Sequence, residues 1–105
     1  MLTDQLARCS ALLRKAVAYM SAIPGTPQEK LRGMVAKTGF GSLSEYEFPS
    51  GTLRDNFHAI AGQISDDPES RFDSIKAMSD ERARRVIDQI SKLSNAVSDA
   101  LGGQK

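Results

Sequence analysis

The sequence is short of the residues that most often build disulfides and metal centres. It has one cysteine, Cys9, one histidine, His58, and no tryptophan among its 105 residues. One cysteine cannot form an intramolecular disulfide, and zinc sites need several Cys or His ligands at defined spacings. We therefore expect no metal and no cofactor. The cysteine usage predicts a reducing compartment, the cytoplasm, with Cys9 acting as a small buried hydrophobe in its helix.

Long apolar runs are also missing. A membrane-spanning helix needs about 20 apolar residues in succession, and the one candidate segment is interrupted by Arg8, Arg14 and Lys15. The sequence thus predicts neither a membrane span nor a secretory signal peptide. Charge of neither sign dominates, because 14 basic residues stand against 13 acidic ones. With only four phenylalanines and two tyrosines, the chain does not indicate a nucleic-acid partner that stacks its bases on aromatic rings.

Apolar residues instead recur at helical spacing. At both ends of the chain they alternate steps of three and four, which is the spacing of one stripe along an α-helix. The first stripe contains Leu2, Leu6, Cys9, Leu13, Ala16, Met20 and Ile23, and the last contains Ala83, Val86, Ile90, Leu93, Val97 and Ala100. We predict one all-α domain, 1–105, a small bundle of four to five helices. Its long terminal helices are expected to pack together, within one chain or across a homodimer.

Proline, glycine and capping residues set the boundaries of the first two helices. Pro24 and Gly25 follow the first stripe, and proline disfavours helical geometry in the residue before it. The segment Thr26-Pro27-Gln28-Glu29 is typical of a capped helix start, with proline in the first helical position. It predicts a second helix over 27–38, which ends where Gly39 adopts the left-handed conformation.

The same signals predict three further helices, and no strand pattern accompanies them. The expected helices cover 53–64, capped by Thr52; about 68–77, with Phe72 and Ile75 facing inward; and the stretch from Ser79 or Asp80 to Gly102. Between the second and third helices, the stretch 39–51 is predicted to be a loop with one helical turn after Ser42.

This loop is the first candidate site, because it holds three aromatic residues beside two carboxylates. They are Phe40, Tyr46 and Phe48, with Glu45 and Glu47. One interpretation is that the rings tuck under the bundle as a satellite of the core. The other is that they form a protein-binding patch, since aromatic anchors carry much of the energy of protein interfaces.

A second candidate lies on the third helix, where Arg54-Asp55-Asn56-Phe57-His58 places an arginine one turn before the only histidine. A cationic neighbour disfavours protonation of the imidazole, so we expect a neutral His58 that can act as a base. The segment resembles the motif of the HEPN ribonucleases, small helical bundles in which an Arg closely followed by a His cleaves RNA as a dimer. That motif has four to six residues between the pair, whereas this chain has three. The resemblance implies RNA processing; the residues alone also fit a boundary histidine that hydrogen-bonds locally.

The start of the last helix is basic. Arg82, Arg84 and Arg85 can meet phosphates, but Asp88 falls one turn from both Arg84 and Lys92. Ion pairs at this spacing contribute about 0.2–0.5 kcal/mol each. The spacing favours a solvated, self-paired face over a nucleic-acid interface.

Together these patterns favour a non-enzymatic protein whose partner is another protein. It would act as an adaptor, inhibitor or regulator through the aromatic loop and the surface of the bundle. The alternative function is RNA processing or nucleic-acid binding through Arg54, His58 and the basic end helices.

Overall fold

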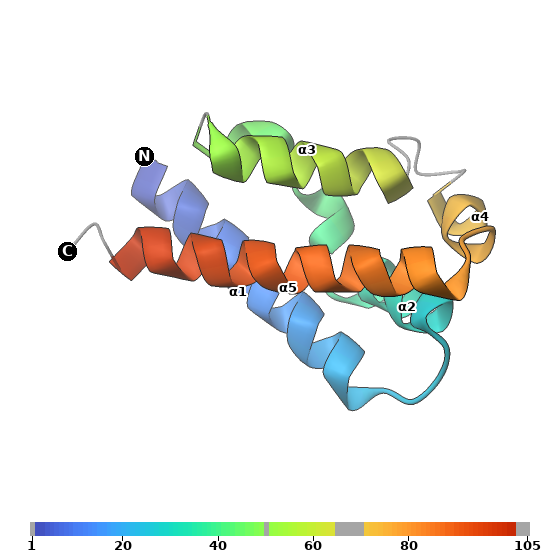
Figure 1. Cartoon of the computed structure of the whole chain (residues 1–105). Coiled ribbons are helices and arrows are strands. Elements are labelled where there is room, and N and C mark those ends of the chain that lie inside the picture. Colours follow the sequence, from blue (N-terminus) through green and yellow to red (C-terminus); the bar gives the residue numbers. More distant parts are fainter. Residues whose placement is uncertain (1, 50, 65–70, 103–105) are drawn as a thin grey trace.

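The computed structural model describes residues 2–49, 51–64 and 71–102, and the described part of the chain is all-α. Its elements, shown in Figure 1, are α1 (Leu2–Ala22), α2 (Pro27–Lys37), the 3-10 turns η1 (Phe40–Ser42) and η2 (Glu45–Glu47), α3 (Thr52–Ile64), α4 (Arg71–Lys76) and α5 (Asp80–Gly102). The predicted small helical bundle is therefore confirmed. The start predicted for the fourth helix at Pro68 and the side chains of Leu2 and Phe72 lie outside the described residues.

The helix starts follow from local capping. The side chain of Thr26 accepts a hydrogen bond from the Glu29 N–H (3.2 Å), with Pro27 at the start of α2. Ser79 caps α5 by accepting from the Arg82 N–H at 3.1 Å. The predicted cap Thr52 is instead the first residue of α3, because the preceding Gly51 carbonyl already accepts the first helical hydrogen bond.

Helices α1 and α5 pack against each other in opposite directions and cross obliquely (Figure 1). The hydroxyls of Ser10 and Ser98 approach to 3.5 Å, and Arg14 donates to the Ser98 hydroxyl at 3.4 Å. The stripe residues of α1 from Leu6 to Met20 and those of α5 from Ala83 to Val97 are buried. The terminal helices thus pair within one chain.

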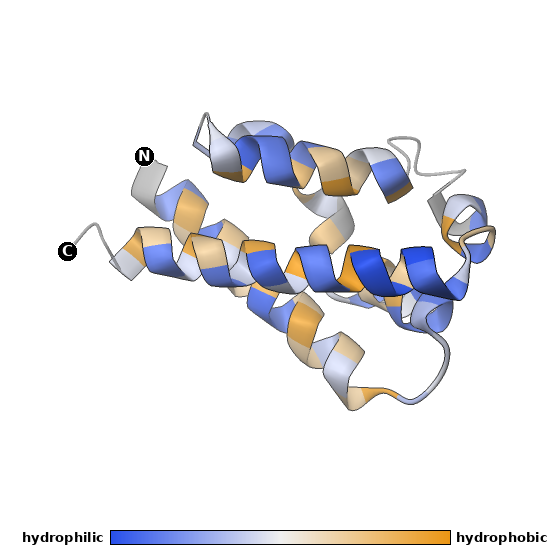
Figure 2. Ribbon diagram, viewed as in Figure 1, coloured by the Kyte–Doolittle hydropathy of each residue, from blue (hydrophilic) through white to orange (hydrophobic). Residues whose placement is uncertain are grey.

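The other helices close this pair into a core. Helix α3 runs along α5 and buries Phe57, Ile60 and Ile64, while α2 and α4 cover the other end with Leu31, Met34 and Ile75. Figure 2 shows that the outward face of α5 is hydrophilic over its first half, as expected for a helix that buries its apolar side chains on the other face. Each large apolar side chain buried in this way contributes about 1.5–3 kcal/mol. None of the described helices combines the length and apolar character needed to cross a membrane.

Gly33 of α2 lies against the side chain of Tyr19 on α1. A methyl group at this position would lie 2.5 Å from the hydroxyl oxygen of Tyr19 and 2.8 Å from its Cε1. The sequence pattern indicated only a glycine that weakens the middle of a helix. The structure shows its use, since the absent side chain makes room for the ring of Tyr19.

We expect alanine at two helical glycines to change stability by different amounts. Gly33→Ala should stabilise the protein less than Gly62→Ala does, because the ring of Tyr19 must move to admit the Cβ, and this offsets the roughly 1 kcal/mol gained in helix propensity. Gly62→Ala should raise the free energy of unfolding by about 0.5–1 kcal/mol, since a Cβ there meets nothing within 4 Å and alanine favours the helix. Urea unfolding of both variants gives the comparison. Equal stabilisation by the two substitutions would contradict the packing assigned to Tyr19.

Candidate functional site

The segment between α2 and α3 is more ordered than the sequence predicted, because it contains two 3-10 turns. The second, η2, is closed by a capping box in which the Ser44 hydroxyl accepts from the Tyr46 N–H (3.3 Å) and the Glu47 carboxylate accepts from the Ser44 N–H (3.0 Å). Gly39 adopts the predicted left-handed conformation, with φ of 82°. These hydrogen bonds hold the backbone of η2, which carries the side chains of Tyr46 and Glu47.

Two of the three rings in this segment belong to the core. Phe48 is completely buried and stacks on Phe57 with the ring centroids 4.6 Å apart; Phe40 is 4% exposed and lies 5.8 Å from the same ring. Phe40 and Phe48 were candidates for partner contact, and in this structure they present no surface to a partner. The interpretation that the rings tuck under the bundle therefore holds for Phe40 and Phe48, since both pack against the ring of Phe57.

Tyr46 points the other way. Its side chain is 71% exposed, and it is the one large hydrophobic residue exposed in the described part of the chain. The guanidinium carbon of Arg54 lies 5.5 Å from the centre of its ring, within range of a cation–π interaction. Arg54 also donates from Nε and Nη2 to the Phe48 carbonyl oxygen, at 3.2 and 2.9 Å. Through Arg54, helix α3 therefore contacts both the end of η2 and the exposed ring of Tyr46.

His58 meets a carboxylate from the same turn. Its Nδ1 lies 2.5 Å from Glu45 Oε2. From the sequence, only Arg54 was considered as a charged neighbour of His58, and this carboxylate was missed. The Arg54 and His58 side chains are thus both engaged with η2, one through a backbone carbonyl and one through a side chain. Residues one helical turn apart lie on the same face of α3. This spacing lets both side chains contact η2. We define the Tyr46 surface as Glu45, Tyr46, Arg54 and His58.

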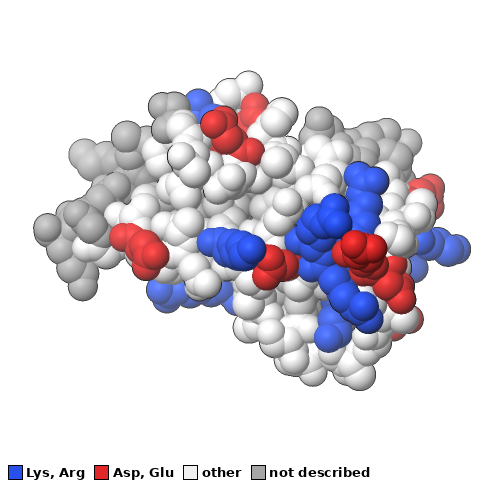
Figure 3. All heavy atoms as spheres, in the orientation of Figure 1, with Lys and Arg blue, Asp and Glu red and all other residues white. Residues whose placement is uncertain are grey.

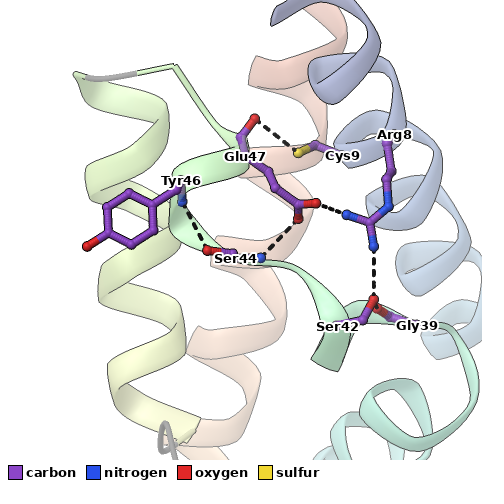
Figure 4. A network of polar contacts seen from close by, with 7 residues as sticks. All are labelled: Arg8, Cys9, Gly39, Ser42, Ser44, Tyr46 and Glu47. Atoms are coloured by element: carbon purple, nitrogen blue, oxygen red, sulfur yellow. Dashed lines mark hydrogen bonds and ion pairs between the residues drawn. The ribbon is translucent and has the colours of Figure 1, made fainter. Parts of the chain in front are cut away.

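Helix α1 contacts the side of η2 that faces away from Tyr46 (Figure 4). Glu47 forms an ion pair with Arg8, which also donates to the Ser42 hydroxyl at 3.2 Å. One residue along, the Cys9 thiol lies 3.7 Å from the Glu47 carbonyl oxygen. Burial raises the pKa of this thiol above its ordinary value, with the nearby charge of Arg8 acting in the opposite direction. The Glu47 carboxylate is therefore committed to contacts within the chain.

The basic residues of α5 lie elsewhere. Figure 1 shows that α3 and α5 run in opposite directions, and Gln63 near the end of α3 donates to Gln89 of α5 at 2.8 Å. Given a rise of about 1.5 Å per residue, Arg54 therefore lies roughly 20 Å along the bundle from Arg84. The structure does not bring the Arg54–His58 pair together with Arg82, Arg84 and Arg85. No group of three or more His, Cys, Asp or Glu among the described residues is placed to hold a metal ion.

Two substitutions at neighbouring positions of η2 should separate core from surface. Phe48→Ala is expected to cost about 3–5 kcal/mol of unfolding free energy, because it removes a fully buried ring. Tyr46→Ala should cost no more than about 1 kcal/mol, the scale of an exposed cation–π contact. Urea unfolding measures both. Similar losses for the two variants would contradict the assignment of Tyr46 to the surface.

The Cys9 thiol should react slowly in the native protein. Burial restricts access to it, and its raised pKa lowers the thiolate fraction near neutral pH. Reaction with a chromogenic disulfide reagent is expected to be much slower in buffer than in urea. Since the raised pKa keeps the folded thiol neutral where the unfolded one ionises, stability should fall as pH rises above the ordinary thiol value of 9.0. Equal reaction rates in buffer and urea would show that the thiol is accessible.

The chain was compared with known proteins of three kinds. Comparison with protein-family models, with curated proteins and with solved structures finds no match for this chain. The resemblance to the HEPN motif therefore remains one of five residues, 54–58.

Proposed function

We propose that this protein binds another protein through the Tyr46 surface and has no enzymatic activity of its own, acting as an adaptor, inhibitor or regulator. The observation that carries the proposal is the exposure of Tyr46, 71%, in a part of the chain whose other large apolar side chains are covered. A large exposed ring costs solvation free energy in the free protein. Tyrosine and arginine are also the residue types enriched where interfaces concentrate their binding energy.

The support beneath Tyr46 favours this role over that of an incidental surface residue. The turn that carries the ring is fixed by its capping box, by Arg54 on the Phe48 carbonyl and by the contacts of Glu47 to α1. A ring held in this way loses little conformational freedom when a partner covers it, so more of the contact energy remains as affinity. The arrangement is that of a preorganised anchor.

The chemistry around the ring indicates the kind of partner. Tyr46 offers an apolar face with a hydroxyl at its tip, and beside it lie the Glu45–His58 pair and the Arg54 guanidinium. A complementary surface would have an apolar pocket for the ring and a polar rim containing at least one carboxylate for Arg54.

Site-specific photocross-linking tests the proposal. A benzophenone amino acid replaces Asp55, an exposed residue beside Arg54, so that Tyr46 remains intact. We expect covalent adducts with a protein in a lysate of the protein's own source. These adducts should fall at least tenfold when Tyr46→Ala is added to the cross-linking protein, and should persist with Tyr46→Phe, which keeps the ring.

Two controls make the result decisive. The same cross-linker at Ala22, about 20 Å along α1 from Cys9 by the helical rise, should give none of these adducts. Nuclease treatment and higher salt should leave the adducts unchanged, since phosphate-driven binding weakens steeply with salt and an apolar contact does not. Adducts that survive Tyr46→Ala would refute the proposal. Adducts that consist of RNA and disappear with nuclease would favour the alternative function instead.

A further inference from the structure

A groove separate from the Tyr46 surface lies between α1, α2 and α5. Because α1 and α5 cross obliquely, the last turns of α1 diverge from the first half of α5 (Figure 1). The start of α2 closes the third side of this space. The resulting groove has a volume of about 360 Å³, which falls in the range of about 300–1,000 Å³ typical of small-molecule sites.

The floor of the groove is lined by apolar side chains, and small side chains line its walls. Met20 is buried at the bottom, with Val17 and Ile87 partly buried beside it. Ser21 on α1 and Ser91 on α5 also line the space. Serine side chains are too short to fill it, so the two helices leave room for an apolar group, with hydroxyls at the sides that can donate or accept hydrogen bonds.

Two cations from different helices also line the groove. They are Lys30 of α2 and Arg84 of α5, and no acidic residue is among the described residues that line it. Within the described part of the chain, no ion pair involves either side chain. The one carboxylate of α2 is that of Glu29, which lies against Gly25, itself a lining residue of the groove.

The carboxylates one turn from Arg84 on its own helix are occupied elsewhere. Asp88 pairs with Lys92 at 2.9 Å, Glu81 with Arg85 at 3.4 Å, and Asp80 accepts from the Gln28 side chain at 2.9 Å. Figure 3 shows Lys and Arg side chains gathered over the first half of α5, with Asp and Glu side chains between them. The predicted pairing of Asp88 is therefore observed for Lys92, and not for Arg84 among the described residues.

We propose that this groove, which we call the Lys30–Arg84 groove, binds a small amphiphilic anion, a molecule with one phosphate or carboxylate group on a short apolar chain or ring. The anionic group would lie between Lys30 and Arg84, since two cations on separate helices can clamp one oxyanion from two sides. The apolar part would cover Met20, Val17 and Ile87. Desolvation of this floor supplies affinity, and the paired cations supply selectivity for the anion.

Titration of the isotope-labelled protein with hexyl phosphate, followed by amide chemical shifts, tests the proposal. We expect saturable shifts at Met20, Lys30 and Ile87. Hexanol, which has the same chain without the charge, and inorganic phosphate, which has the charge without the chain, should each bind at least about tenfold more weakly. Hexanoate should bind in place of hexyl phosphate and compete with it. Shifts that never saturate, or that saturate elsewhere on the surface, would overturn the proposal.

Neighbouring arginines provide the matched control. Arg84→Gln is expected to weaken hexyl phosphate binding about tenfold, whereas Arg85→Gln makes the same change in net charge at a residue engaged with Glu81 and should leave binding within about twofold. Both side chains are exposed, so neither substitution should unfold the protein. Equal losses for the two variants would show general attraction to a basic surface and would refute a defined site.

A variant that fills the groove gives an independent test. Ser21 is exposed on α1, and Ser21→Leu places an apolar side chain in the proposed site at a position where leucine suits the helix. The variant should keep its fold, as judged by circular dichroism, and lose hexyl phosphate binding. Unchanged binding by a folded Ser21→Leu protein would rule the groove out. Because Tyr46 is not involved, these outcomes are separate from those of the cross-linking experiment.

Discussion

The burial of the Phe48 ring against Phe57 is the constraint on which the candidate site depends. This one stacked pair fixes the end of η2, and with it the carbonyl that receives the Arg54 guanidinium. Once that carbonyl is fixed, the preceding residues are fixed too: Glu47 faces α1 and Tyr46 faces solvent beside Arg54. A buried contact in the core thus determines the direction of an exposed ring two residues away.

The sequence predicted the helices well because their signals are local. Apolar spacing identified the buried faces of α1 and α5, and Thr26, Pro27 and Gly39 set the limits of α2 to within one residue. The loop was harder, since alternation cannot tell which of Phe40, Tyr46 and Phe48 faces inward when no regular period relates them. That outcome depends on Phe57, a residue of a different element, and on a capping box within a 3-10 turn.

The charged residues show the same division between local and tertiary information. The pairing of Asp88 with Lys92 follows from helical spacing alone and was predicted. The pairing of His58 with Glu45 joins residues 13 apart, and that of Arg8 with Glu47 joins residues 39 apart, so neither had a local signal. The Lys30–Arg84 groove is of this second kind, because it exists only where three helices diverge.

The pairing of α1 with α5 also has a consequence for the order of events during synthesis. The hydrogen bond between Ser10 and Ser98 joins residues 88 apart, so the part of α5 that covers the apolar stripe of α1 is translated long after α1 itself. Until then the nascent chain has a helix whose buried face is uncovered, and the native core cannot close. During the interval between translation of α1 and translation of α5, the apolar face of α1 can therefore associate with other chains or with a chaperone.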